Sequence, residues 1–194
     1  MGGATIYFIR HGQTAWNAEL RFQGQRDVPL NDIGLAQARD NGRRLARLLS
    51  DVARVDFVAS PLGRARATME IMRQAMGLDP AGYRIDERLV EASYGTLEGT
   101  TLAEFKARFP EVHRHRKRER WHFRPPGGES HAMVLERVLP WLHALERDTV
   151  VSAHGVVGRV LRHHLLGIEP NAAAAYAFPQ DRICVWRDGV ETLV

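Results

Sequence analysis

Two histidines, each followed by glycine, stand directly after runs of apolar residues in this sequence. His11, preceded by Arg10, follows the first run, and His154 follows a later one. Arg64 and Glu91 come shortly after two further strand-like runs. The carboxyl ends of parallel strands meet at one edge of a sheet, where open α/β folds bind ligands. The sequence therefore predicts that these five side chains, distant along the chain, form one site.

Such a set of side chains suits phosphoryl transfer. A phosphoryl group in flight spreads negative charge over its equatorial oxygens, and arginine guanidinium groups match these oxygens with paired donors. A neutral imidazole can attack phosphorus and form a labile phosphoramidate, which divides one difficult displacement into two easier ones. A carboxylic acid protonates the leaving alkoxide and, once ionised, takes a proton from water.

The same residues have less demanding interpretations. A histidine after a strand is often structural, although two of them with matched arginines favour a shared site. A metal centre of His11, Glu91 and His154 is a further alternative. The chain lacks the i,i+4 histidine pair of helical zinc motifs and a second carboxylate cluster, so we predict no metal and no cofactor. Glu91 is the least specific of the set, because Glu87 and Glu98 lie nearby.

The elements that must position these side chains alternate between strand and helix. This alternation predicts an α/β fold of three α/β/α layers, with a mostly parallel central sheet and helices on both faces. Strands are expected at residues 5–9, 55–59, 83–89 and 149–153, and a terminal hairpin at 183–186 and 190–193. Helices are expected at about 32–50, 62–76, 101–110 (closed by Pro110), 129–146 and 155–166.

Length and composition indicate one ordinary globular domain. The 194 residues are 44% hydrophobic and 26% charged, so we expect one domain at 1–194, with a lid or insert at about 100–130. The single cysteine, Cys184, excludes an intramolecular disulfide and is expected in the core. No signal peptide or membrane-length apolar run is visible, so we expect a cytoplasmic protein without a membrane partner.

The net charge of +4 favours anionic partners, and the most basic stretch lies at residues 113–124. It has three interpretations: a solvated helix face, a lid whose cations recruit a substrate with several negative charges, or a nucleic-acid arm. Trp121 and Phe123 could stack on bases in such an arm. No recognised nucleic-acid motif accompanies them, so a nucleic-acid partner is not expected.

Four segments together resemble the signature blocks of a known family. They are Arg10-His11-Gly12, SPLGRARAT at residues 60–68, EASYGTLEG at residues 91–99, and Ala153-His154-Gly155. In this order, and across nearly the whole chain, they are similar to the histidine phosphatase superfamily, in the branch with cofactor-dependent phosphoglycerate mutases and small phosphatases. The resemblance implies that His11 is the phosphorylated nucleophile and Glu91 the proton donor and acceptor. It implies that the phosphoryl group and substrate are bound by Arg10, Asn17, Gln23, Gly24, Arg64 and His154.

The resemblance favours a phosphomonoesterase that acts on a small phosphorylated metabolite. The first alternative is a phosphoglycerate mutase, which passes the phosphoryl group to a substrate hydroxyl instead of water. Mutase members are typically longer between the glutamate block and the second histidine block, whereas this chain has only residues 99–149 there. A non-catalytic anion-binding module is a second alternative, but it would have lost the nucleophile or the acid, and both are present. The substrate and the oligomeric state, a homodimer included, stay open.

Overall fold

The computed structural model describes residues 4–194; residues 1–3, which the expected domain includes, lie outside the described residues. Within the described part, six strands form one mixed sheet in the order β3-β2-β4-β1-β5-β6. The strands are β1 (Ile6–Arg10), β2 (Asp56–Ala59), β3 (Arg84–Ile85), β4 (Thr149–Ala153), β5 (Cys184–Arg187) and β6 (Val190–Leu193). Neighbouring strands among β1 to β4 run parallel, while β5 and β6 are antiparallel additions. The expected α/β fold with a mostly parallel sheet is confirmed.

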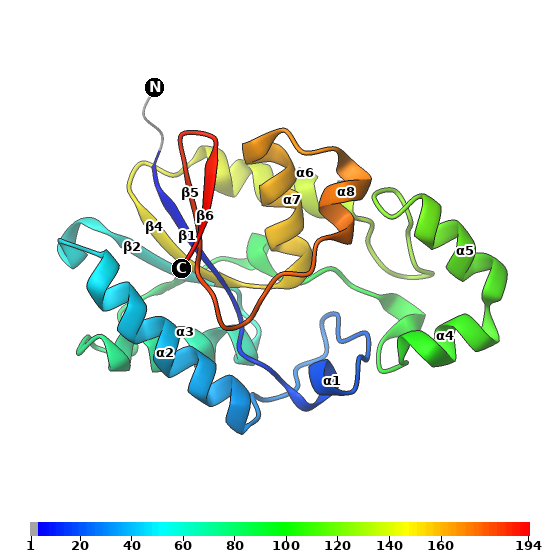
Figure 1. Cartoon of the computed structure of the whole chain (residues 1–194), viewed down its shortest axis with the longest axis horizontal. Helices are drawn as coiled ribbons and strands as arrows, with labels where there is room; N and C mark the ends of the chain where they lie inside the picture. The colour runs from blue at the N-terminus through cyan, green and yellow to red at the C-terminus, as the bar shows by residue number, and fades with distance from the viewer. Residues whose placement is uncertain (1–3) are drawn as a thin grey trace.

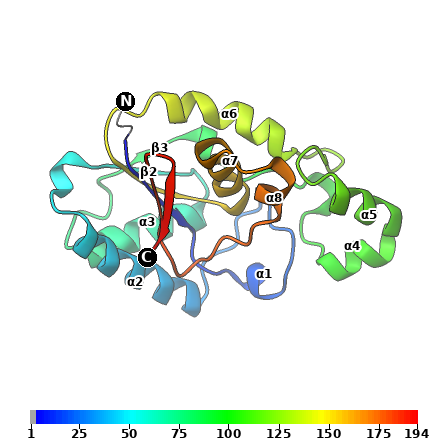
Figure 2. The ribbon, with the colours of Figure 1, turned by 45° about the horizontal axis from the view of Figure 1, so that its top comes forward.

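Helices cover both faces of this sheet (Figures 1 and 2). They are α1 (Ala15–Ala18), α2 (Asp32–Leu48), α3 (Gly63–Ala75), α4 (Leu102–Arg108), α5 (Pro110–Arg118), α6 (His131–His143), α7 (Gly155–Leu166) and α8 (Pro170–Ala175). In Figure 2, α2 and α3 lie on one side of the strands, and α6 and α7 lie on the other. Both figures show α4 and α5 as a pair set apart from these layers.

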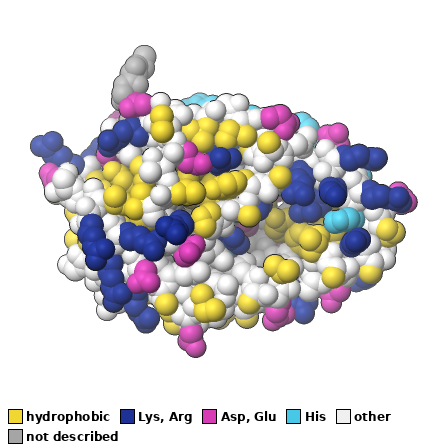
Figure 3. All heavy atoms as spheres, viewed as in Figure 1, with side chains coloured by type: hydrophobic (Ala, Val, Ile, Leu, Met, Phe, Trp, Pro, Cys, Tyr) yellow, Lys and Arg dark blue, Asp and Glu magenta, His cyan; other side chains and the backbone are white. Residues whose placement is uncertain are grey.

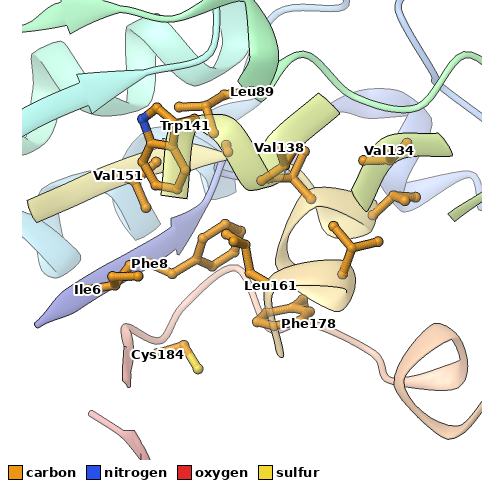
Figure 4. Packing of buried hydrophobic residues seen from close by; sticks show 14 of the residues in the cluster. Ile6, Phe8, Leu89, Val134, Val138, Trp141, Val151, Leu161, Phe178 and Cys184 are labelled. Atoms are coloured by element: carbon orange, nitrogen blue, oxygen red, sulfur yellow. The ribbon is translucent and has the colours of Figure 1, made fainter. Parts of the chain in front are cut away.

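Alternation along β1 explains why this strand lies in the middle of the molecule. Ile6 and Phe8 belong to the apolar cluster under α6 and α7, whereas Tyr7 and Ile9 belong to the cluster under α2 and α3. Successive strand side chains point to opposite faces, so a strand with two covered faces is apolar throughout. Figure 4 shows Phe8 packed among side chains of the first cluster, with Cys184 nearby as expected.

Three expectations about the elements need correction. The strand expected at 83–89 ends after Ile85, because the Asp86 side chain accepts from the Arg88 N–H and caps a 3₁₀ turn. Pro110 opens α5 rather than closing the helix before it, which ends at Arg108. A proline at the first helical position needs no N–H partner, so the same residue suits a start. Helix α8 and the single turn α1 were not expected at all.

Among residues 4–194, no helix is both long and apolar enough to cross a membrane.

Candidate active site

The carboxyl ends of β1 and β4 bring the two histidines together. Arg10 lies opposite Ala153 in the parallel pairing, and the His11 N–H extends it by donating to the Ala153 carbonyl at 2.9 Å. Each strand ends at a histidine, and the two rings lie 5.2 Å apart between centroids. Both side chains are buried, His11 being 3% exposed and His154 0%. The sheet thus joins positions 143 residues apart, as the sequence predicts.

The hydrogen bonds of His11 define its tautomer. Its Nδ1 lies 2.8 Å from the Gly12 carbonyl oxygen, which can only accept, so Nδ1 carries the proton. Its Nε2 lies 3.2 Å from the Arg64 Nε–H, which can only donate, so Nε2 presents a lone pair. Burial, and then the charges of Arg64 and Arg10, hold the pKa of His11 well below its usual value. The imidazole is therefore neutral, and its lone pair lies on Nε2, where it accepts from Arg64.

Arg64 is held rigidly in the first turn of α3. Its Nη1 and Nη2 donate to the carbonyls of Arg26 and Gly24, both at 2.7 Å, while Nε faces His11. The side chain is 1% exposed, and burial lowers its pKa while nearby carboxylates oppose that shift. Asp27 is the nearest of these carboxylates, at 3.7 Å from Nη1. The guanidinium is therefore positioned mainly by backbone oxygens, leaving its charge to act on a ligand.

His154 is tied to Ser60, the residue that follows β2. Its Nε2 lies 2.6 Å from the Ser60 hydroxyl, and its Nδ1 is buried without a hydrogen-bond partner. Burial, followed by Arg64, His11 and Arg10, lowers the pKa of His154 well below its usual value. The neutral ring lies beside His11, but it does not line the open cavity.

Glu91 is held by the start of α7. Its carboxylate accepts from the Val156 N–H at 3.2 and 3.3 Å and from the Ala92 N–H at 3.0 Å. Helix N-termini favour negative charge, because their first N–H groups lack partners within the helix. Glu91 is 8% exposed and still reaches the cavity. It is therefore an anchored carboxylate rather than a surface one.

A cavity of about 100 Å³ joins His11, Arg64 and Glu91. Its walls are formed by Arg10, His11, Asn17, Arg21, Phe22, Gln23, Gly24, Arg64, Glu91, Tyr94, Gly155 and Arg159. Figure 3 shows the molecule hollowed between α1, α8 and the α4–α5 pair, with Lys and Arg side chains gathered on the α5 side. A larger hollow of about 870 Å³ lies near the β5–β6 hairpin, away from the two histidines.

Two buried donors on the cavity wall lack partners. Arg10 donates through Nη1 to the Phe178 carbonyl at 2.9 Å, but its Nε is buried and unpaired. Burial, aided by Arg159, lowers its pKa to about 10. Gln23 accepts from Thr14 through Oε1, while its Nε2 is likewise buried and unpaired. Because buried polar groups normally have partners, these donors indicate a place for ligand oxygens.

The loop after β1 positions the other expected residues. Asn17 accepts from Thr14 in a capping box at the start of α1, and it also accepts from Gln180 at 2.9 Å. Gly24 has φ +57°, and a Cβ there would collide with the Glu98 side chain. The structure thus places every expected site residue at this edge of the sheet, with His154 just behind the cavity wall.

Gly12 is required because a side chain would not fit there, and not only because the backbone turns sharply. A Cβ at Gly12 would collide with the carbonyl oxygen of Gly34, where the loop crosses the start of α2. The Gly12 N–H donates to the Thr68 hydroxyl at 3.0 Å, and that hydroxyl donates to the Arg64 carbonyl at 2.8 Å. The loop that carries His11 is therefore fixed against both α2 and α3.

Several residues of the site were not assigned a role from sequence. They are Ser60, which contacts His154; Gln180, whose amide donates to the His11 carbonyl at 2.9 Å; Arg21; Phe22; and Arg159. Ser60 lies directly at a strand end, a position that could have marked it. Gln180 and Arg159 carry no such signal, because only the tertiary fold brings them to the cavity.

The basic stretch at 113–124 is divided between solvent and core. Trp121 and Phe123 are 5% and 8% exposed, so neither ring is available to stack on bases. Arg116 lies over the Phe22 ring at 5.3 Å, next to the cavity wall. Most other cations of the stretch face solvent. Within residues 4–194, no group of three or more His, Cys, Asp or Glu side chains is arranged to hold a metal ion.

Comparison with known proteins agrees with this geometry. The histidine phosphatase superfamily (branch 1) matches residues 6–187. A 2,3-bisphosphoglycerate-dependent phosphoglycerate mutase of Azorhizobium caulinodans is 33% identical over 97% of this chain and 94% of its own length. A protein of the same name from Brucella melitensis is 35% identical over 86% of this chain and 83% of its own.

Solved structures show the same likeness. A mycobacterial glucosyl-3-phosphoglycerate phosphatase, solved with VO3, superimposes with a TM-score of 0.78 at 29% identity, covering 94% of this chain and 92% of its own. YhfR of Bacillus stearothermophilus gives a TM-score of 0.79 at 28% identity, covering 98% and 95%. The resemblance drawn from the four sequence blocks is thus confirmed, and the chain belongs to the histidine phosphatase superfamily, branch 1.

Proposed function

We propose that this enzyme is a phosphomonoesterase, which hydrolyses a small phosphorylated metabolite through a phosphohistidine at His11. The observation that carries the proposal is the tautomer of His11. Its Nδ1 proton is committed to the Gly12 carbonyl, so the lone pair on Nε2 faces the cavity beside Arg64. A buried neutral imidazole in this state is a ready nucleophile.

In the first step Nε2 attacks phosphorus, and the bond from phosphorus to the substrate oxygen breaks. As Nε2 bonds to phosphorus, a phosphoryl oxygen replaces Nε2 as the acceptor of the Arg64 Nε–H, and the unpaired Arg10 Nε supplies a second donor. Glu91 enters this step as the carboxylic acid and gives its proton to the leaving alkoxide. His154 lies behind the cavity wall, and its unpaired Nδ1 becomes a further donor to the phosphoryl oxygens once the phosphoryl group is bound at His11.

In the second step water attacks the phosphorus of phosphorylated His11. Glu91, now a carboxylate, takes a proton from the water, the N–P bond breaks, and the electron pair returns to Nε2. Inorganic phosphate leaves, and Glu91 is again protonated. The cycle needs no metal ion, because arginine and histidine donors offset the charge of the phosphoryl group.

The short segment between the two blocks leaves the cavity near solvent, which supports hydrolysis, but it is shared with relatives named as mutases, one of which is covered over 94% of its own length. Residues 99–149 contribute only α4, α5 and α6, and the mouth beside α5 is open to solvent in Figure 3. A relative of known structure is also named as a phosphatase. Phosphoglycerate mutase remains the second candidate, because the curated relatives above carry that name.

The remaining features of the proposal concern the protein as a whole. We infer one domain, in which residues 100–130 form a lid over the cavity, and a cytoplasmic enzyme whose partner is its small phosphorylated substrate. We infer no membrane or nucleic-acid partner. A homodimer is compatible with the proposal.

The test is to trap the intermediate. Quenching without acid during turnover should leave an acid-labile, base-stable phosphoryl group on the wild type. His11→Ala should lose both the label and turnover, whereas the matched control His122→Ala, at an exposed position, should keep both. Turnover by His11→Ala would rule the mechanism out. Phosphate release should dominate even with millimolar 3-phosphoglycerate present; faster interconversion of 2- and 3-phosphoglycerate would instead establish the mutase.

A further inference from the structure

Gln180 lies outside the four sequence blocks, in the loop that runs from α8 to β5 (Figure 1), yet its side chain reaches two residues of the site. Its Nε2 donates to the His11 carbonyl oxygen and to Asn17 Oδ1, both at 2.9 Å. A carbonyl oxygen can only accept, so the atom that faces it must be the amide nitrogen. The main chain of His11 therefore defines the direction of the Gln180 amide.

The direction of the Asn17 amide is defined in a similar way. The Thr14 N–H donates to Asn17 Oδ1 at 3.2 Å, and a main-chain N–H can only donate, so this atom is the amide oxygen. With Gln180 as the second donor, both lone pairs of Oδ1 are used. The Nδ2 group of Asn17 is therefore free to donate in the other direction, and it contacts Gln23 Oε1 at 3.4 Å.

Gln23 completes a row of three side-chain amides, Gln180, Asn17 and Gln23, which we call the amide chain. Its Oε1 accepts from Asn17 Nδ2 and from the Thr14 hydroxyl, the latter at 3.1 Å. Among residues 4–194, Gln23 Nε2 has no hydrogen-bond partner, although it is buried and Gln23 lines the cavity. Each amide thus donates to the oxygen of the next, and the last amide keeps a donor for a ligand.

The loop that carries Gln180 is anchored through its main chain. The buried Asn41 of α2 donates to the Gln180 carbonyl at 3.2 Å. Arg10, at the end of β1, donates to the Phe178 carbonyl at 2.9 Å. Because the loop is held from both α2 and β1, the Gln180 side chain extends toward Asn17 from a fixed main chain.

We propose that Gln180 is a positioning residue for the reaction. Through Asn17 it orients the Gln23 amide, so that Gln23 Nε2 donates to an oxygen of the phosphoryl group at His11. This inference rests on the proposed function and adds a residue to it. Hydrogen-bonded groups in a row polarise one another, and a donor that is already oriented needs no rearrangement during the reaction. Such a donor stabilises most strongly the oxygens that carry negative charge in the transition state.

The first experiment replaces Gln180 by methionine, which keeps the length of the side chain but cannot donate. For an aryl phosphate, kcat/KM should fall about 3–10-fold, the usual worth of one neutral hydrogen bond, and kcat should change more than KM. The inhibition constant of vanadate should rise by a similar factor, because vanadate resembles the five-coordinate phosphorus. The matched control Gln74→Met, at an exposed glutamine of α3, should leave both quantities unchanged.

The vanadate measurement separates positioning from instability. A smaller folded fraction would lower kcat but leave the inhibition constant of vanadate at the wild-type value. Gln180→Glu provides a second variant of the same size, in which a carboxylate faces the two oxygens that now accept from Gln180. It should raise the inhibition constant at least as much as Gln180→Met does. An unchanged inhibition constant in both variants would overturn the proposal.

A double-mutant cycle tests the link to Gln23. Gln23→Leu should by itself raise the inhibition constant of vanadate about 10–100-fold, because it removes a donor to a charged oxygen. In that background Gln180→Met should add no more than about twofold, since the amide that it orients is gone. Full multiplication of the two effects would overturn the amide chain.

A crystal structure of the wild type with vanadate needs no variant. Gln23 Nε2 should lie within about 3.2 Å of a vanadate oxygen, and a Gln23 amide turned away from vanadate would overturn the proposal. These results are distinct from a failure of the proposed function, which a wild type without phosphohistidine and without turnover would show. In that case the affinity for vanadate, measured by calorimetry on the same variants, would still decide the role of Gln180.

Discussion

The two ends of the cavity are built in different ways. At the inner end, Arg64 is 1% exposed and two of its three nitrogens donate to backbone carbonyls. At the outer end, Arg159 has one backbone contact, and Arg116 has a phenyl ring beneath it. The inner residues come from the central strands and the helices that follow them. The outer wall draws on α5 and on the second turn of α7.

From this difference we expect the inner end to carry out the chemical step and the outer end to select between substrates. Groups held by backbone atoms keep their positions whatever substrate is present, which suits stabilisation of a transition state common to all phosphomonoesters. Cations with few protein partners gain most from a ligand that neutralises them, so they discriminate between ligands. Changes at the inner end should therefore affect every substrate, and changes at the outer end should affect ratios between substrates.

The largest effect is expected for Glu91→Gln, and its size should depend on the leaving group of the substrate. The amide keeps the size of the side chain but cannot exchange a proton, so alkyl phosphates should be turned over about 10²–10⁴-fold more slowly. An activated aryl phosphate leaves without much help from the acid, so its phosphorylation step should suffer far less. Stopped-flow measurement should show a burst of aryl alcohol followed by slow turnover. Equal slowing of both steps for both ester classes would contradict the role of Glu91.

Arg64→Met should lower kcat/KM by about 10²–10³-fold for all substrates alike, because it removes a pre-positioned donor to the phosphoryl group. The ratios of the remaining activity between different phosphate esters should be those of the wild type. The matched control is Arg66→Met on the same helix, an exposed side chain whose Nε contacts the Tyr83 hydroxyl. Steady-state kinetics on several phosphate esters measures both quantities. A change in these ratios larger than the common loss would show that the two ends are not separate.

The smallest expected effect concerns His131, the first residue of α6. Its Nε2 is buried and unpaired, and burial, with Arg159 and Arg116 next, lowers its pKa to about 3. The charge of Arg120 also lowers the pKa of His131, whereas a hydrogen bond with the Arg120 backbone raises it. The unfolded chain protonates this ring near pH 6.5, so folded stability falls as pH drops from there towards 3, by at most about 1.4 kcal/mol per pH unit.

His131→Gln removes this titration. Between pH 7 and pH 4.5 the melting temperature of the variant should therefore fall less than that of the wild type. The lowered pKa values of His11 and His154 reduce the stability of both proteins equally as the pH falls. Their contribution therefore cancels from the difference in melting temperature. Thermal unfolding across this pH range provides the measurement, and parallel curves would count against the buried state of His131.

Much of the inner end could be predicted from sequence, because its signals are local. A buried strand that stops at Arg10-His11 indicates that these residues lie at the edge of the sheet, and the same pattern recurs at His154. The capping box at Thr101 likewise predicts its helix correctly. Helix α8 carries no such pattern, because its sequence after Pro170 is mostly alanine and shows no apolar periodicity.

The outer end could not be predicted from sequence, because only tertiary packing brings its residues together. Arg159 is one of several arginines on α7 and the loops around it, and only the packing of α7 selects it over Arg162, which pairs with Glu191 instead. Gln180 reaches His11 from a loop near the C-terminus. Such roles depend on which segments meet in space, and no spacing along the chain encodes that meeting.

The closely packed glycines Gly12 and Gly34, next to His11, have a consequence for recombination. Gly12 and Gly34 lie so close that a Cβ on either would collide with the backbone of the other segment, and Gly42 meets Met72 of α3 in the same manner. A substitution at one position can be accommodated only if its opposite segment retreats. In chimaeras made from two parents, the loop after β1, helix α2 and helix α3 should therefore be inherited as one block.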